Sequence, residues 1–104
     1  MTSEKRRYPR FPVDLRVVLE VGGEQIEARA CDLSLGGMVV ECARGLPFDT
    51  EVVAVMVMPT LTEPARIPAN VRWTIAEGMG LAFGTIRTVE ARAIHHLEDV
   101  VLGR

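Results

Sequence analysis

The sequence of 104 residues is poor in cysteine, in lysine and in aromatic side chains. Its two cysteines, Cys31 and Cys42, are too few for a dense disulfide framework or a four-cysteine metal site, so a reducing cytoplasmic environment is expected. The longest uncharged stretch, residues 52–62, contains Pro59 and is far shorter than a membrane-spanning helix. We therefore expect no membrane insertion, and the charged first ten residues argue against a signal peptide.

Catalytic motifs are also missing, since the sequence has no HExxH, no GxSxG and no phosphate-binding loop. A cysteine–histidine enzyme would need Cys31 or Cys42 beside His95 or His96, but both cysteines lie in strand-like apolar segments. The two histidines are adjacent on a predicted helix and point about 100° apart, so they cannot easily share a metal ion. We expect neither an enzyme nor a metal or cofactor site.

The basic residues are unevenly distributed. Residues 1–16 carry a net charge of +3 and the other 88 residues carry −5, which together give the overall −2. A local basic arm on an acidic body suits a small anionic ligand better than a long DNA or RNA duplex.

Alternating and continuous apolar residues predict about six strands followed by one helix. The strands are expected at residues 13–21, 24–33, 38–42, 51–58, 65–75 and 81–83, with turns at 22–23 and 78–80. The helix is expected to begin with Thr88 as its N-cap and to end at Gly103. This pattern favours an all-β antiparallel barrel or sandwich, as a single domain with an arm (1–11), a β-barrel (12–85) and a C-terminal helix (88–102).

The arm has three arginines, Arg6, Arg7 and Arg10, in a segment that contains Pro9. Guanidinium groups in an extended segment can bind phosphate or the edge of a guanine, and can stack on a purine. A solvated tail would have the same composition.

A second candidate segment joins two predicted strands and contains Asp32, Ser34, Gly36 and Gly37. Asp32 and Ser34 project to the same side of an extended chain, where they can bind a guanine, a phosphate or an arginine. The glycines leave room for a ligand, although a β-bulge with a local serine turn explains the same residues. Trp73, the one tryptophan, either packs in the core or provides a stacking platform for guanine.

Taken together, the Arg-x-x-x-Arg of Arg6 and Arg10 and the Asp-x-Ser-x-x-Gly of Asp32, Ser34 and Gly37 resemble the PilZ domain family over essentially the whole chain. The resemblance implies a six-stranded antiparallel β-barrel of the split-barrel type with a flanking C-terminal α-helix. It also implies binding of cyclic di-GMP, a bacterial second messenger, with the arginine arm wrapped over the ligand and the Asp-x-Ser-x-x-Gly strand forming a wall.

The function implied by this resemblance is that of a cytoplasmic, non-enzymatic receptor in second-messenger signalling, such as the control of motility or biofilm formation. Its arm becomes ordered on the ligand and changes the surface presented to an unidentified downstream protein; a monomer or weak homodimer is expected. Whether the domain binds one ligand molecule or an intercalated pair remains open, because Lys5 stands at a position that varies within the family. The alternatives are a PilZ-type adaptor that acts only through protein contacts, and a barrel that binds single-stranded nucleic acid.

Overall fold

The barrel begins with a long hairpin in which β1 (Phe11–Val21) pairs antiparallel with β2 (Glu24–Leu33). The turn between the two strands consists of Gly22 and Gly23, whose φ angles of 53° and 89° lie in the left-handed region. Glycine adopts that region without steric cost, so the two glycines explain the tight turn. The computed structural model describes residues 8–104.

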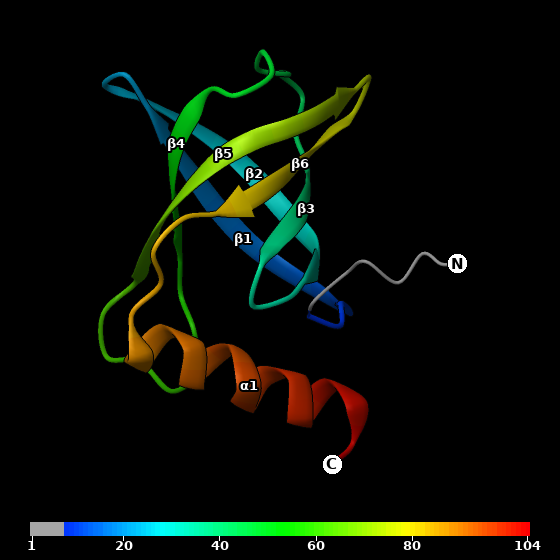
Figure 1. Ribbon diagram of the computed structural model, residues 1–104, viewed down its shortest axis with the longest axis vertical. Coiled ribbons are helices and arrows are strands. Elements are labelled where there is room, and N and C mark those ends of the chain that lie inside the picture. Colours follow the sequence, from blue (N-terminus) through cyan, green and yellow to red (C-terminus); the bar gives the residue numbers. More distant parts are fainter. Residues whose placement is uncertain (1–7) are drawn as a thin grey trace.

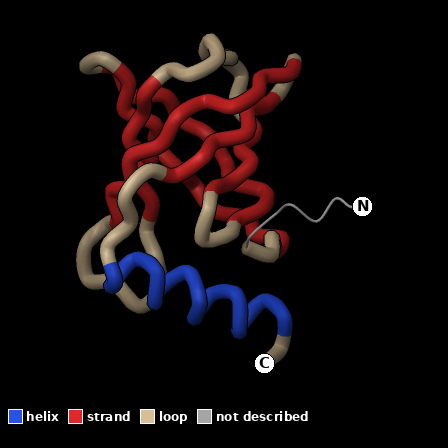
Figure 2. Tube along the Cα trace, viewed as in Figure 1, coloured by secondary structure: helices blue, strands red, loops and turns tan. Residues whose placement is uncertain are grey.

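Four further strands close the barrel, and every neighbouring pair is antiparallel. They are β3 (Gly37–Glu41), β4 (Glu51–Met56), β5 (Ala65–Ile75) and β6 (Gly78–Phe83). The order around the barrel is β1-β2-β3-β6-β5-β4 (Figure 1), and Figure 2 shows these strands grouped on one side of the single helix. The expected six-stranded antiparallel β-barrel is therefore confirmed.

The core lies inside the barrel and continues to the helix α1 (Thr88–Leu102), which lies across one end of the barrel (Figure 1). Ala93, Ile94 and Leu97 form the buried side of this helix. The largest fully buried apolar side chains belong to both parts of the core: Phe11, Leu19, Leu33, Met56, Met58, Ile67, Met79 and Ile94.

Several expected boundaries are wrong: β1 begins at 11 instead of 13, β3 spans 37–41 instead of 38–42, β4 ends at 56 instead of 58, and β6 begins at 78 instead of 81. Phe11 was expected to end the arm, but it is the first residue of β1 and only 2% exposed, because its ring fills the core. The turn expected at residues 78–80 lies at 76–77 instead, and Gly78 already belongs to β6. A Cβ atom at Gly78 would lie 2.7 Å from the carbonyl oxygen of Val40, so this glycine permits the close approach of β3 rather than a turn.

The helix has the expected bounds, residues 88–102, but a different N-cap. Arg87, not Thr88, is the N-cap, and the carboxylate of Glu90 accepts a hydrogen bond from the Arg87 backbone N–H at 3.0 Å. Gly103 ends the helix as expected, with a φ of 74°.

Candidate ligand-binding site

A bulge in β2 positions the first half of the site. Ala30 pairs with Val40 and Asp32 pairs with Val39, which leaves Cys31 as the extra residue. The bulge turns Cys31 and Asp32 both toward the outside of the barrel, where each is partly exposed. Asp32 Oδ1 accepts a hydrogen bond from the Val39 N–H at 3.2 Å, so its side chain also braces the irregular pairing.

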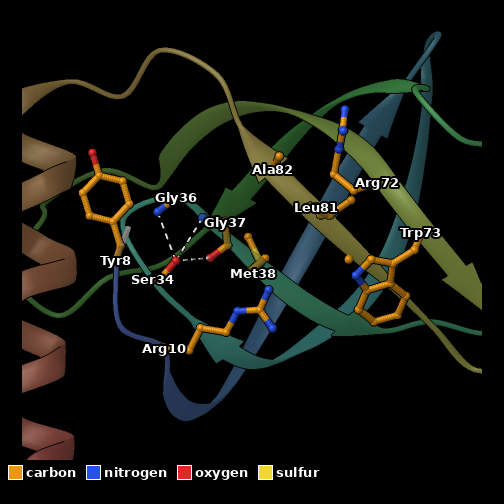
Figure 3. Close-up of a pocket in the computed structure, with 11 residues that line it drawn as sticks. Tyr8, Arg10, Ser34, Gly36, Gly37, Met38, Arg72, Trp73, Leu81 and Ala82 are labelled. Carbon is orange, nitrogen blue, oxygen red and sulfur yellow. Dashed lines mark hydrogen bonds between the residues drawn. The ribbon is translucent and has the colours of Figure 1, made fainter. Parts of the chain in front are cut away.

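The segment after β2 is held by the buried Ser34. Its Oγ accepts hydrogen bonds from the backbone N–H groups of Gly36 and Gly37 at 3.0 and 3.2 Å, shown as dashed lines in Figure 3. Its own N–H donates to the carbonyl oxygen of Gly37 at 2.9 Å. The local serine turn considered as an alternative is therefore present, and the same residues also line a pocket.

Glycines occupy two positions where the backbone closely approaches a neighbouring strand or ring. A Cβ atom at Gly37 would lie 2.1 Å from the carbonyl oxygen of Leu81 in the neighbouring strand β6. A Cβ atom at Gly36 would lie 3.1 Å from Cδ2 of the Tyr8 ring. Larger residues at these positions would therefore displace either the barrel wall or the aromatic ring.

A second bulge, in β5, positions the other half. Val71 pairs with Leu81 and Trp73 pairs with Gly80, so Arg72 is the extra residue, and both Arg72 and Trp73 are exposed. The indole lies against Gly80, where a Cβ atom would be 2.2 Å from its Nε1. Trp73 is 39% exposed, so the core-packing interpretation of this residue is wrong; the bulge reverses the side to which it points.

These elements surround a pocket of about 290 Å³ on the outside of the barrel (Figure 3). Both of its charged lining residues, Arg10 and Arg72, are cationic. The lining is otherwise aromatic, small or apolar, and consists in full of Tyr8, Arg10, Ser34, Gly36, Gly37, Met38, Arg72, Trp73, Gly80, Leu81 and Ala82. Such a lining suits an anion that also carries flat apolar surfaces.

Asp32 does not line the pocket, but it forms an ion pair with Arg10, which does. Arg10 Nη1 lies 3.8 Å from Asp32 Oδ2, with the two side chains 38% and 28% exposed. An ion pair of this length and exposure contributes little to stability, but it restricts the direction of the guanidinium group. Figure 3 shows that guanidinium directed toward the region between Met38 and Trp73.

Five of the predicted site residues line this one pocket: Arg10, Ser34, Gly36, Gly37 and Trp73. Asp32 is linked to the pocket only by its ion pair with the lining residue Arg10. Arg6 and Arg7 lie outside the described residues.

The sequence prediction missed Tyr8 and Arg72 as lining residues. Tyr8 lies within the Arg-x-x-x-Arg segment itself, and Arg72 is the neighbour of Trp73. The guanidinium of Arg72 also lies 5.2 Å from the ring centroid of Phe48, an exposed residue of the loop before β4.

Metal-binding groups and membrane-spanning helices are assessed over residues 8–104. In that part of the chain no group of three or more histidine, cysteine or acidic side chains is arranged to hold a metal ion. Over the same residues, no helix combines the length and the apolar character needed to cross a membrane.

Comparison with known proteins gives a consistent result. A family model described as "PilZ domain" matches residues 4–101. No relative was found among curated proteins. One similar solved structure is the Bacillus subtilis inhibitor of motility MotI/DgrA, with a TM-score of 0.78 and 23% sequence identity. A second is the PilZ domain of YcgR from Escherichia coli with c-di-GMP, with a TM-score of 0.78 and 15% identity. A third is the K. pneumonia MrkH–c-di-GMP complex, with a TM-score of 0.72 and 21% identity.

The extent of these matches differs. The three structural matches cover 98%, 96% and 97% of this chain, but the chain spans only 54% of the B. subtilis inhibitor and 54% of MrkH, against 93% of the YcgR domain. The structural likeness supports the fold, and the family model covers nearly all of the sequence. The chain belongs to the PilZ domain family.

Proposed function

We propose that this domain is a non-enzymatic receptor for cyclic di-GMP and that the pocket between Arg10 and Trp73 is its binding site. The observation that carries the proposal is the convergence of both sequence motifs on one pocket with a cationic lining. Arg10 comes from the first motif, Ser34 and Gly37 come from the second, and Trp73 joins them from β5.

The chemistry of the lining matches the ligand. Cyclic di-GMP has two phosphates and two guanines, so it needs both cationic groups and flat surfaces. Arg10 and Arg72 can donate forked hydrogen bonds to phosphate oxygens or to a guanine edge. Tyr8 and Trp73 offer aromatic faces, and stacking a base on an aromatic ring contributes ~1–3 kcal/mol.

Relatives support the same ligand. The YcgR domain and MrkH, whose folds resemble this one, are described with c-di-GMP bound. The B. subtilis neighbour is described as an inhibitor of motility, which makes motility a candidate process for this domain as well. This reading requires no cofactor besides the ligand.

The proposal extends to signalling. Arg6 and Arg7 precede the two lining residues Tyr8 and Arg10, so they can add guanidinium groups to the phosphates when the ligand binds. The arm becomes ordered over the ligand and alters the surface offered to a downstream protein in the cytoplasm.

Calorimetric titration with cyclic di-GMP tests the proposal. We expect at least micromolar affinity for the wild type and a loss of tenfold or more, at least ~1.4 kcal/mol, for Arg10→Ala. The matched control is Arg44→Ala, because Arg44 is paired with Glu24 and does not line the pocket. If the folded wild type shows no binding, the receptor function is refuted and an adaptor that acts only through protein contacts is favoured.

A further inference from the structure

The outer face of β6 forms the floor of a trough that extends beyond the ligand pocket. Met79 and Leu81 point into the core, which leaves Gly78, Gly80 and Ala82 on the outside of the strand. These residues have little or no side chain, so the outward side chains of their partners on the neighbouring strands border a trough. The partners include Val39 on β3 and Trp73 and Ile75 on β5. Gly80 and Ala82 line the ligand pocket, whereas Gly78 lines a separate groove.

This groove has a volume of about 470 Å³ and an apolar lining. We call it the Ile75 groove; its exposed or partly exposed members are Cys31, Val39, Glu41, Trp73, Ile75 and Glu77. Ile75 is 60% exposed, and it stands beside the half-exposed Trp73 at the edge of the hollow. Exposed apolar side chains around a concave surface are typical of a docking site for another apolar group.

The charge around the Ile75 groove is opposite to that of the ligand pocket. Glu41 and Glu77 are exposed at its rim, and neither carboxylate forms an ion pair with any of residues 8–104. The arginine across from Glu41, Arg29, is already paired with Asp14. The groove therefore complements an apolar side chain that is flanked by lysine or arginine.

Trp73 connects the two sites because it lines both of them. Its indole lies against Gly80, which on β6 stands between Gly78 of the groove and Ala82 of the pocket. A ligand that stacks on the indole fixes this ring and with it one wall of the groove. Fixing the wall beforehand lowers the ordering cost for a second binding partner.

We propose that the Ile75 groove docks a basic segment of a partner protein through an apolar anchor residue, and that cyclic di-GMP strengthens this docking through Trp73. The occupant is a peptide segment with an aliphatic or aromatic residue next to lysine or arginine. The strengthening by cyclic di-GMP depends on the proposed function of the pocket; the docking itself does not.

Peptide selection tests the docking. A random short-peptide library displayed on phage is selected on the wild type and counter-selected on Ile75→Glu. We expect enriched peptides to contain an apolar residue flanked by basic residues, and to bind Ile75→Glu at least about tenfold more weakly. The double substitution Glu41→Gln, Glu77→Gln should weaken binding several-fold and reduce its dependence on salt.

Val100→Glu is the matched control, because Val100 is also 60% exposed but lies on α1. Peptides that bind wild type and Ile75→Glu equally, or enriched peptides without basic residues, would overturn the docking proposal. Self-association that disappears in Ile75→Glu, measured by sedimentation, would instead identify a second copy of the chain as the occupant and overturn the partner assignment.

The coupling is tested with the selected peptide at saturating cyclic di-GMP. We expect its affinity to rise several-fold in the wild type and to stay constant in Trp73→Ala; linkage requires the peptide to raise nucleotide affinity by the same factor. An unchanged affinity in the wild type overturns the coupling. If cyclic di-GMP does not bind at all, the proposed function fails, while the comparison with Ile75→Glu without nucleotide still decides the docking.

Discussion

Gly37 is the residue with the least space for a side chain, because the barrel wall and the pocket meet there. A methyl group would lie 2.1 Å from the Leu81 carbonyl oxygen, which belongs to the backbone and cannot move alone. We expect Gly37→Ala to lower the free energy of unfolding by about 1–3 kcal/mol, the usual cost of overpacking. Urea denaturation measures this difference.

The neighbouring glycine provides the control. A methyl group at Gly36 would meet the Tyr8 ring at 3.1 Å, and a side chain can shift where a backbone cannot. Gly36→Ala should therefore change the free energy of unfolding by less than about 0.5 kcal/mol. Equal losses for the two variants would contradict the assignment of Gly37 to close strand packing.

Asp32 has two roles, which two substitutions separate. Asp32→Ala removes the acceptor of the Val39 N–H and also releases Arg10, so we expect a loss of about 1 kcal/mol in stability together with weaker cyclic di-GMP binding. Asp32→Asn keeps an acceptor oxygen but loses the charge. It should retain most of the stability while binding the ligand more weakly.

Thermal unfolding and nucleotide titration of the two Asp32 variants measure the two roles independently. If both variants bind the nucleotide like the wild type and only the melting temperature falls, Asp32 is a brace of the bulge and has no part in the site.

At the scale of the strand, the two bulges explain what the sequence could and could not predict. Alternation correctly predicted that β5 exists, because Ile67, Ala69 and Val71 point inward at every second position. Continued without interruption, this alternation would also place Trp73 inside, but the bulge at Arg72 turns Trp73 outward. A bulge depends on pairing with β6, which is distant information that no local pattern contains.

The predictions for Gly78 and for the N-cap of α1 are wrong for a similar reason. Gly78 was interpreted as a turn residue, although it serves the close approach of Val40. Residue type favours Thr88 as the helix cap, whereas the hydrogen bond that caps the helix is donated by the Arg87 backbone N–H to the Glu90 carboxylate. In both cases the residue type permits two roles, and only the tertiary contact selects one of them.

The cap of α1 gives a prediction on pH. Burial alone would raise the pKa of Glu90, but hydrogen bonds from the Arg87 side chain and backbone outweigh it, so the pKa is lowered from 4.5. A carboxyl group whose pKa is lowered by folding adds stability above its unfolded pKa and loses that contribution as the pH falls through its folded pKa. Glu90→Gln should therefore be less stable than the wild type at neutral pH.

The difference between wild type and Glu90→Gln should also shrink as the pH is lowered from ~7 to ~3. Chemical denaturation of both proteins at a series of pH values measures it. A stability difference that stays constant over this range would contradict the role of the ionised carboxylate in the cap.

At the scale of the whole molecule, barrel closure brings distant parts of the chain together. Arg10 precedes β1 and Asp32 lies near the end of β2, so the antiparallel hairpin places both at the same end. Hairpin pairing makes this part of the site predictable from sequence. The contribution of Trp73 to the site is not predictable in this way. It depends on the β3-β6-β5 order, which only the closed barrel establishes.

At the scale of the whole molecule, the local charge of each hollow is more informative than the net charge of the chain. A net charge of −2 would not favour an anionic ligand, but the described part of the pocket is lined by two arginines and no acidic residue. The carboxylates of Glu41 and Glu77 instead border the Ile75 groove at the other side of Trp73. One tryptophan thus separates a cationic hollow from an acidic one.

Trp73 also provides the most direct test of the central claim, that cyclic di-GMP binds in this pocket. It is the one tryptophan in the chain and it lines both the pocket and the Ile75 groove, so its fluorescence reports on these two neighbouring hollows. Arg10 lines the pocket and not the groove, so the Arg10→Ala variant assigns an emission change to the pocket. We predict a saturable change in emission on titration with cyclic di-GMP, shifted to at least tenfold higher concentration in Arg10→Ala. Calorimetric binding without any change in Trp73 emission, or no response from a folded protein, would contradict the account.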